Sequence, residues 1–301
     1  MKRSVPVRKI TFRYILNLIL FTLAALLFAI YGVLPAISAN RALHPKRFSV
    51  GDATPDKLGL TYENVTLTTR DGLKIAGWYV PSQNGAVIIA LHGYNGNRTH
   101  VLFHAQLLAK HGYGVMMIDQ RCQGDSDGKL YAFGWDADQD VFAALDYLVG
   151  RPEVDANRIG ILGLSSGAEI AIEAAAGDMR LHAVVSEGAG YETLQDWLIA
   201  PEAPGVILAP GMWVFFKYGS LITGVPEIQP LRVLVTQISP TPILFIAAGR
   251  DRPFNREFYA VSGEPKQFWE RNEPGHVDAL FTHPQEYEER VISFLDEALL
   301  R

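Results

Sequence analysis

The sequence predicts an α/β fold, in which a mostly parallel sheet carries helices on both faces and an N-terminal helix precedes it. Three observations predict this fold. One long apolar run lies near the N-terminus, short apolar segments alternate with helical patterns from residue 86 onward, and a glycine-rich turn joins one such segment to a helix. The chain has 301 residues, of which 49% are hydrophobic and 20% charged, as expected of a folded chain.

The N-terminal segment predicts a membrane anchor. Residues 14–37 carry no charged side chain, and about 20 apolar residues suffice to cross a bilayer. The preceding tail, residues 1–13, is more basic than the linker at 38–58, which places the N-terminus in the cytoplasm and the body of the protein outside. A cleaved signal peptide is the alternative, but this run exceeds the usual length of a signal core. We therefore predict an uncleaved single-pass helix.

Residues 59–301 predict one α/β domain. A β-hairpin is expected first, because two alternating segments, 62–69 and 73–80, flank the turn signal Asp71-Gly72. Further strands are expected at 86–91, 114–118, 158–162, 182–186, 242–247 and 266–272. Helices are expected at 98–111, 136–149, 166–177 and 284–300. Such alternation is typical of a parallel sheet covered on both faces.

Residues 190–239 interrupt this alternation and predict an inserted helical cap. The segment is too long for a simple connection and is rich in aromatic and aliphatic side chains. We expect it to form an apolar pocket for an acyl group, with Trp213 and Phe216 as substrate-binding residues, and to touch the bilayer in part. The alternative is that these side chains only pack the cap onto the domain.

A nucleophile is predicted at Ser165. Residues 163–167 read Gly-Leu-Ser-Ser-Gly, and this G-x-S-x-G pattern follows an apolar strand and opens a helix of small residues. A serine on such a tight turn requires small neighbours and projects its hydroxyl from the sheet. Ser166 is the rival, but only Ser165 holds the central position.

A serine hydroxyl needs a base and an orienting acid, which follow it in chain order in this arrangement. Among the later histidines His182, His276 and His283, we favour His276, because it lies in a turn-rich loop before the last helix. Asp251 directly follows an expected strand and is favoured as the acid over Asp278, which is too close to His276 in sequence to face its ring.

Two backbone N–H groups are expected to bind the oxyanion. One belongs to Ser166, the residue after the nucleophile, and the other to Tyr94 in the loop after the first parallel strand. Gly93 allows the substrate to approach the backbone of that loop closely. His92 is interpreted as a structural residue of the loop.

Together these motifs resemble the α/β-hydrolase superfamily, and in particular membrane-anchored esterases and thioesterases related to dienelactone-hydrolase-like and prolyl-oligopeptidase-like members. The resemblance rests on residues 91–97, 119–128, 151–171, 240–251 and 273–299. It implies an α/β-hydrolase fold and hydrolysis through a Ser-His-Asp triad and an acyl-enzyme, without cofactor or metal. The chain departs from the usual pattern at Cys122 and Ala168, where glycine is common.

The composition limits the classes of partner that the chain is expected to bind. The net charge of −5 argues against nucleic acid, and a single cysteine excludes an internal disulfide framework. The expected partners are a small-molecule or lipid-like acyl substrate and a membrane, and the oligomeric state stays open. An ester or thioester is favoured over an amide, because no acidic anchor for a peptide N-terminus and no propeller domain for peptides is evident. Glu169 and Glu187, near the nucleophile in sequence, are interpreted as helix-surface or loop carboxylates. The alternatives are an aminopeptidase-like peptidase of the same fold and a catalytically silent binding module.

Overall fold

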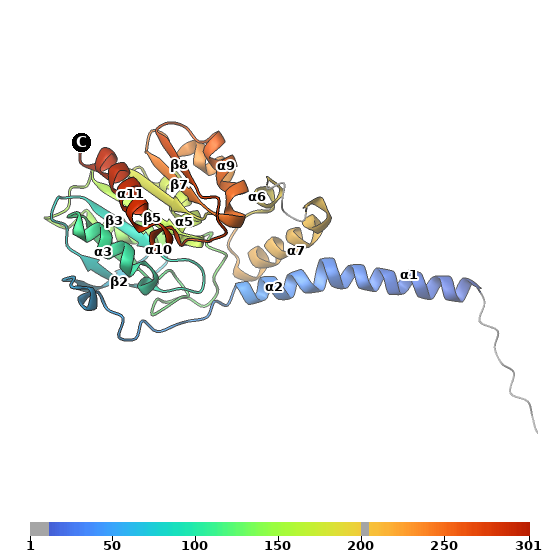
Figure 1. Cartoon of the computed structure of the whole chain (residues 1–301). Helices are drawn as coiled ribbons and strands as arrows, with labels where there is room; N and C mark the ends of the chain where they lie inside the picture. Colours follow the sequence, from blue (N-terminus) through green and yellow to red (C-terminus); the bar gives the residue numbers. More distant parts are fainter. Residues whose placement is uncertain (1–11, 200–204) are drawn as a thin grey trace, which may run out of the picture.

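The computed structural model describes residues 12–199 and 205–301, which form one eight-stranded sheet with flanking helices (Figure 1). Most of the predicted basic tail and five cap positions, 200–204, lie outside the described residues. The strands are β1 (Glu63–Thr68), β2 (Lys74–Val80), β3 (Val87–Leu91), β4 (Gly114–Ile118), β5 (Ile159–Leu164), β6 (Ala183–Glu187), β7 (Ile243–Ala247) and β8 (Lys266–Glu270). Every strand predicted from the sequence is therefore present, with ends shifted by at most two residues.

The strand order is β1-β2-β4-β3-β5-β6-β7-β8. The leading hairpin β1–β2 and the β2–β4 pair are antiparallel, and all pairs from β4 to β8 are parallel. Parallel strands at the centre are buried on both faces and read as continuous apolar runs, as β3, β4 and β7 do. This is the α/β-hydrolase fold that the sequence predicts.

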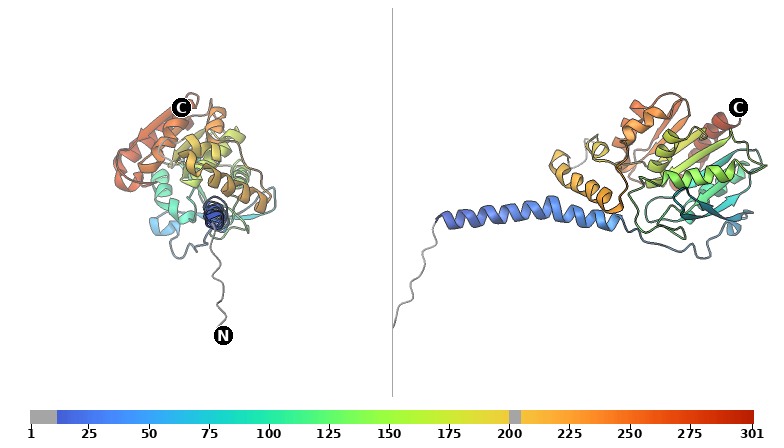
Figure 2. Two further views of the ribbon diagram at one scale, coloured as in Figure 1. Left: turned by 90° about the vertical axis from the view of Figure 1, so that its right-hand side faces the viewer. Right: turned by 180° about the vertical axis from the view of Figure 1, so that it is seen from behind.

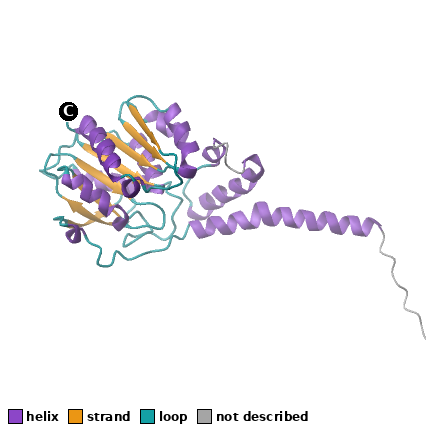
Figure 3. Cartoon of the chain, in the orientation of Figure 1, coloured by secondary structure: helices purple, strands orange, loops and turns teal. Residues whose placement is uncertain are grey.

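Helices cover both faces of the sheet (Figure 3). Two separate apolar cores, one on each face, join the sheet to these helices. One core includes α4 (Asp138–Leu148), α5 (Ser166–Gly177) and α9 (Arg252–Val261); the other includes α3 (Leu102–Lys110) and α11 (Pro284–Leu299). The helix predicted at 98–111 begins as a 3₁₀ turn over Arg98–Val101, and a short α10 (Ala279–Thr282) precedes α11.

The N-terminal helix projects from this body (Figure 2). It consists of α1 (Phe12–Phe28), a π-helical turn (Ala29–Val33) and α2 (Leu34–Ala42). The π turn directly precedes Pro35, whose ring removes one backbone donor from the helix and so disturbs its hydrogen-bond ladder. By length and composition, Phe12–Ala42 and Gly205–Thr223 are the helices in the described ranges that could cross a membrane.

The segment predicted as a cap is mostly helical in its described part. It contains α6 (Leu194–Ile199), α7 (Gly205–Thr223), α8 (Leu231–Leu234) and a 3₁₀ turn (Val235–Gln237). Helix α7 packs along α2 rather than only on the sheet, so the cap joins the N-terminal helix to the domain (Figure 1). A short 3₁₀ turn (Pro55–Leu58) lies in the connection between α2 and β1, and another (Gly249–Asp251) follows β7.

Candidate active site

Ser165 occupies a strained turn between β5 and α5. Its backbone has φ 55° and ψ −121°, a conformation that non-glycine residues rarely adopt and that costs about 1–3 kcal/mol. The turn closes only because its neighbours are small. A Cβ on Gly163 would overlap the backbone oxygen of Gly167, and a Cβ on Gly167 would lie 2.6 Å from the backbone oxygen of His92. The G-x-S-x-G pattern therefore has the steric basis that the sequence predicts.

Three predicted residues meet at the carboxyl ends of the parallel strands. His276 Nε2 lies 2.8 Å from Ser165 Oγ, and His276 Nδ1 lies 2.7 Å from Asp251 Oδ2. Asp251 is nearly buried, in the turn that follows β7, and Asn255 donates to its backbone oxygen. The three side chains form one continuous hydrogen-bonded chain, which can move a proton away from the serine hydroxyl.

The hydrogen bond to Asp251 is the main reason why the pKa of His276 is raised above its ordinary value. Asp278, the rival acid, points away from the ring, because its carboxylate accepts from Arg271 Nη1 at 2.6 Å. His283 lies near Glu273, at 3.2 Å, and not at the serine. The geometry thus separates the favoured residues from their rivals.

The loop after β3 brings Gly93 and Tyr94 to the serine. A Cβ on Gly93 would lie 3.1 Å from Ser165 Cβ, so glycine is what permits this approach. Tyr94 lines the same pocket as Ser165, and its hydroxyl donates to the backbone oxygen of Ala42 at 3.0 Å. His92 is fully buried, accepts from Gln120 N at 3.1 Å, and has its pKa lowered to about 4 mainly by burial. It is the structural histidine that the sequence predicts.

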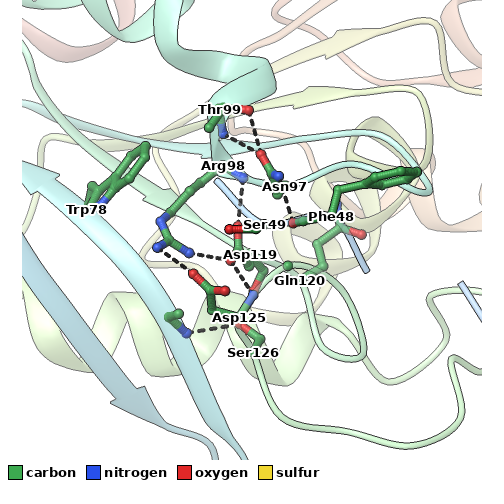
Figure 4. A network of polar contacts seen from close by, with 12 residues as sticks. Phe48, Ser49, Trp78, Asn97, Arg98, Thr99, Asp119, Gln120, Asp125 and Ser126 are labelled. Atoms are coloured by element: carbon green, nitrogen blue, oxygen red, sulfur yellow. Dashed lines mark hydrogen bonds and ion pairs between the residues drawn. The ribbon is translucent and has the colours of Figure 1, made fainter. Parts of the chain in front are cut away.

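A buried polar network fixes this loop (Figure 4). Arg98 forms an ion pair with Asp119, which also accepts from the Arg98 backbone N–H at 2.6 Å. The guanidinium reaches Asp125 at 2.9 Å and stacks over the ring of Trp78. Asn97 binds the Phe48 backbone oxygen at 2.9 Å. The network therefore ties the loop after β3 to the loop after β4 and to the linker that follows α2.

A pocket of about 610 Å³ opens beside Ser165 and is bounded by the cap. Eight of its 19 lining residues are aromatic: Tyr94, Tyr131, Phe133, Tyr191, Trp197, Phe215, Phe216 and Phe254. Phe216 lies deep in this wall, edge-on to Phe133, and is 3% exposed. Ser166 also lines the pocket, so both residues predicted to supply oxyanion donors border it.

Trp213, the other predicted substrate-binding residue of the cap, is not among the residues that line this pocket. Its side chain is 53% exposed. It precedes Phe216 by one turn, about 4.5 Å along the axis of α7, and this displacement carries it past the pocket wall. Phe215, which sequence analysis did not single out, takes its place and stacks on Phe133 with 4.8 Å between ring centroids.

The structure corrects the interpretation of Glu169 and Glu187 as surface or loop groups, because Glu169 lines the pocket and Glu187 is buried. Glu169 lines the pocket and accepts from the Gly190 N–H at 2.8 Å; burial raises its pKa to about 7. Glu187 is buried at the end of β6 and accepts from the Ala279 N–H at 3.1 Å. Their positions carry a signal that could have found them: Glu169 lies one helical turn after Ser165, and Glu187 ends β6 at the same sheet edge.

Glu192 is a further pocket residue that sequence analysis missed. It is 2% exposed, and within the described ranges neither carboxylate oxygen has a hydrogen-bond partner. Burial raises its pKa well above the ordinary value, and the charge of Glu169 raises it further. An unpaired buried carboxylate is costly, so this end of the pocket is suited to a ligand group that donates hydrogen bonds.

The chain matches a known protein family and is similar to a solved esterase structure. The family described as X-Pro dipeptidyl-peptidase (S15 family) matches residues 71–281, a range that contains Ser165, Asp251 and His276. The esterase Pf2001 of Pyrococcus furiosus is similar in structure, with a TM-score of 0.67 and 25% sequence identity; the match covers 85% of this chain and 98% of the esterase.

Two sequence relatives extend the comparison. The uncharacterized protein YfhR of Escherichia coli (strain K12) is 27% identical over 296 residues, which cover 93% of this chain and 95% of YfhR. The thiohydrolase aneE of Aspergillus aculeatus is 32% identical over 137 residues, which cover 44% of this chain and 43% of the thiohydrolase.

Proposed function

This chain belongs to the X-Pro dipeptidyl-peptidase (S15) family and is a hydrolase of the α/β-hydrolase superfamily, and we propose that it is a membrane-anchored serine hydrolase that cleaves ester or thioester bonds. One observation carries the proposal: Ser165, His276 and Asp251 form a hydrogen-bonded chain at the mouth of an apolar pocket. Their proposed roles are nucleophile, general base and orienting acid.

In the proposed first half-reaction, His276 Nε2 takes the hydroxyl proton as Ser165 Oγ attacks the acyl carbon. Asp251 holds the ring in the required tautomer and stabilises the imidazolium. The Ser166 and Tyr94 N–H groups are the proposed donors to the oxyanion, and Ser166 stands at the N-terminus of α5, where the helix dipole favours negative charge. The tetrahedral intermediate then releases the alcohol or thiol, which takes its proton from His276.

In the second half-reaction, His276 removes a proton from water, which attacks the acyl-enzyme carbonyl. Collapse of the second tetrahedral intermediate breaks the bond to Ser165 Oγ, and His276 returns the proton to the serine. The products are a carboxylic acid and the regenerated enzyme. Besides the substrate and water, the proposed steps draw on side chains and backbone groups of this chain.

The substrate class is inferred from the pocket and from the relatives. Aromatic walls beside the serine suit an apolar acyl group. The similar structure from Pyrococcus is named an esterase, and the partial relative from Aspergillus a thiohydrolase. The uncharged run within Phe12–Ala42 supports an N-terminal anchor, and the basic residues before it favour a cytoplasmic N-terminus with the domain outside.

The proposal is tested with three substrates that share one hexanoyl group and differ in the bond: a p-nitrophenyl ester, a thioester and an anilide. We expect the ester and thioester to be hydrolysed much faster than the anilide. Ser165→Ala should lower kcat by about 10⁴–10⁶-fold on both good substrates while leaving the thermal unfolding midpoint near that of the wild type. Turnover that survives Ser165→Ala, or preference for the anilide, would contradict the proposal.

A second candidate function is cleavage of peptides with a free amino terminus, and Glu169 and Glu192 favour it. Sequence analysis set peptides aside because no acidic anchor was evident, yet the pocket contains these two carboxylates. An ionised carboxylate here could pair with an ammonium group in a site screened from water. The family name itself describes a dipeptidyl-peptidase.

An X-Pro dipeptide p-nitroanilide and its N-acetylated form distinguish this candidate. If a carboxylate binds the ammonium, the free form should be preferred, and Glu192→Gln should reduce that preference by about tenfold or more. The preference should also grow as the pH rises through about 7, where Glu169 becomes ionised. Equal rates for the free and acetylated forms, unchanged in Glu192→Gln, would rule out the peptidase candidate and leave ester or thioester cleavage as the one proposed function.

A further inference from the structure

Helix α7 leaves an apolar face without a partner in the described chain. Val206 is 79% exposed and Leu221 is 80% exposed, although both are aliphatic. The helix has a single charged residue, Lys217, and this ammonium is paired with Glu227 at 2.8 Å. Such a face is unusual on a surface bathed by water, because contiguous apolar area commonly marks a contact site.

The contacts of α7 fix how it lies against the N-terminal helix. Gly211 faces Pro35 and Tyr31, and further along Tyr218 lies 3.3 Å from Asn40, hydroxyl to amide oxygen. Residue numbers therefore increase in the same direction along both helices. It follows that the first turns of α7 lie toward α1, while its last turns lie toward the domain, as Figures 1 and 2 also show.

The parallel direction of the two helices indicates how deep the exposed face of α7 would lie in a bilayer. If residues 14–37 cross a bilayer, the level at which Gly211 meets Pro35 is near the outer end of the span. Val206 lies five residues before Gly211, which is at most about 7.5 Å deeper along α7. Helices that lie in a membrane interface bury their apolar face by about 5–10 Å.

We propose that the N-terminal half of α7 inserts shallowly into the leaflet where the anchor ends, as a second membrane contact. The proposal rests on the anchor put forward under the proposed function. A bilayer is favoured as the occupant because α7 packs on α2 and on the π-helical turn, and these belong to the same continuous N-terminal helix as the fully exposed apolar α1. Arg41 and Lys46, which follow the span, then lie at headgroup level, where anionic lipids favour basic side chains.

The insertion places the pocket at the membrane surface. Ala42, at the end of α2, and Phe215, on α7, are both walls of the pocket that contains Ser165. The pocket is therefore walled in part by α2 and α7, the two elements that the proposal places at the lipid surface. An acyl chain of a membrane lipid would then reach Ser165 past α2 and α7. The inferred source of the apolar substrate is therefore the membrane itself.

The test measures lipid contact at single positions of the full chain. In a Cys122→Ser background, one cysteine is introduced by Ile19→Cys, Val206→Cys or Leu221→Cys and labelled with the environment-sensitive dye NBD. The labelled protein is reconstituted in phosphatidylcholine vesicles with or without doxyl-labelled lipid. Leu221 is the matched control for Val206, because it lies on the same helix with equal exposure but nearer the domain.

We expect doxyl lipid to quench NBD at positions 19 and 206 at least about twofold more than at position 221, since only the first half of α7 enters the leaflet. Quenching at 19 with 206 no different from 221 would overturn the second contact and leave the anchor intact. No quenching at 19 would refute the anchor and this inference with it. A shielded, unquenched dye at 206 with energy transfer between labelled copies would assign the face to self-association and overturn the inference.

Discussion

Asp251 and Asp278 show how residue-scale geometry selects between two carboxylates, one in the turn after β7 and one in the loop after β8. Asp251 faces the imidazole, whereas Asp278 is held by Arg271. Asp251→Asn should therefore lower kcat by about 10⁴-fold, because an amide favours the wrong tautomer of His276. Asp278→Asn is the matched control and should change kcat by less than about tenfold. Ester hydrolysis at saturating substrate measures both, and equal losses would reassign the acid.

The same contact makes a pH prediction. The hydrogen bond to Asp251 raises the pKa of His276 above 6.5, and the histidine acts as a base only when it is neutral. The value of kcat/KM should therefore fall as the pH drops through a midpoint above 6.5. In Asp251→Asn the residual activity should titrate at a lower pH, because the stabilising carboxylate is gone. A midpoint that does not move in this variant would mean that Asp251 does not act on the ring.

Residue-scale prediction from sequence succeeded where a motif fixed the backbone. Ser165 stands on a turn that only small neighbours permit, and Asp251 and His276 follow strands whose carboxyl ends converge. Their juxtaposition was therefore predictable, although their catalytic roles stay proposals. Glu192 was not predictable in the same way, because it packs against Gly134 and Trp135 in the loop after β4, and no local pattern reports burial by distant residues.

At the scale of elements, helix α7 underlies a prediction about the length of the acyl chain that the pocket accepts. Phe215 lines the pocket and Trp213, on the same helix, does not. Activity on p-nitrophenyl esters should rise from acetyl to medium acyl chains, because each buried methylene contributes up to about 0.8 kcal/mol. Phe215→Ala should flatten this rise, whereas Trp213→Ala should leave it unchanged. The prediction is tested by measuring kcat/KM across the ester series for the wild type and both variants. Equal effects of the two substitutions would mean that the pocket does not select the acyl chain.

Elements with a strong period were predicted closely, and those shaped by packing were not. The strands and the helices α4, α5 and α11 follow from apolar runs and 3.6-residue patterns. The cap was predicted only as a helical insertion. Which face of α7 meets the pocket depends on its contact with α2, and that contact joins residues nearly 180 positions apart. Trp213 was misassigned for this reason, because apolar composition alone does not say which side chains turn inward.

At the scale of the whole molecule, the proposed anchor makes a prediction about cells. The full chain should stay with membranes after alkaline carbonate extraction, because about 20 apolar residues give effectively irreversible insertion. Added protease should digest the domain in intact spheroplasts if it lies outside. Release of the full chain by carbonate would contradict the anchor. Protection from protease until the cells are lysed would reverse the orientation.

The central claim is that Ser165 is an activated nucleophile, and covalent labelling tests it most directly. The wild-type chain is treated with a fluorophosphonate, and mass spectrometry of the intact protein and its peptides locates the adduct. We predict one adduct, on Ser165, that persists in Ser166→Ala and is lost in Ser165→Ala. Of these two serines, Ser165 is the one whose hydroxyl is hydrogen-bonded to His276. An adduct on Ser166, undiminished labelling of Ser165→Ala, or no labelling of the folded wild-type chain would contradict the account.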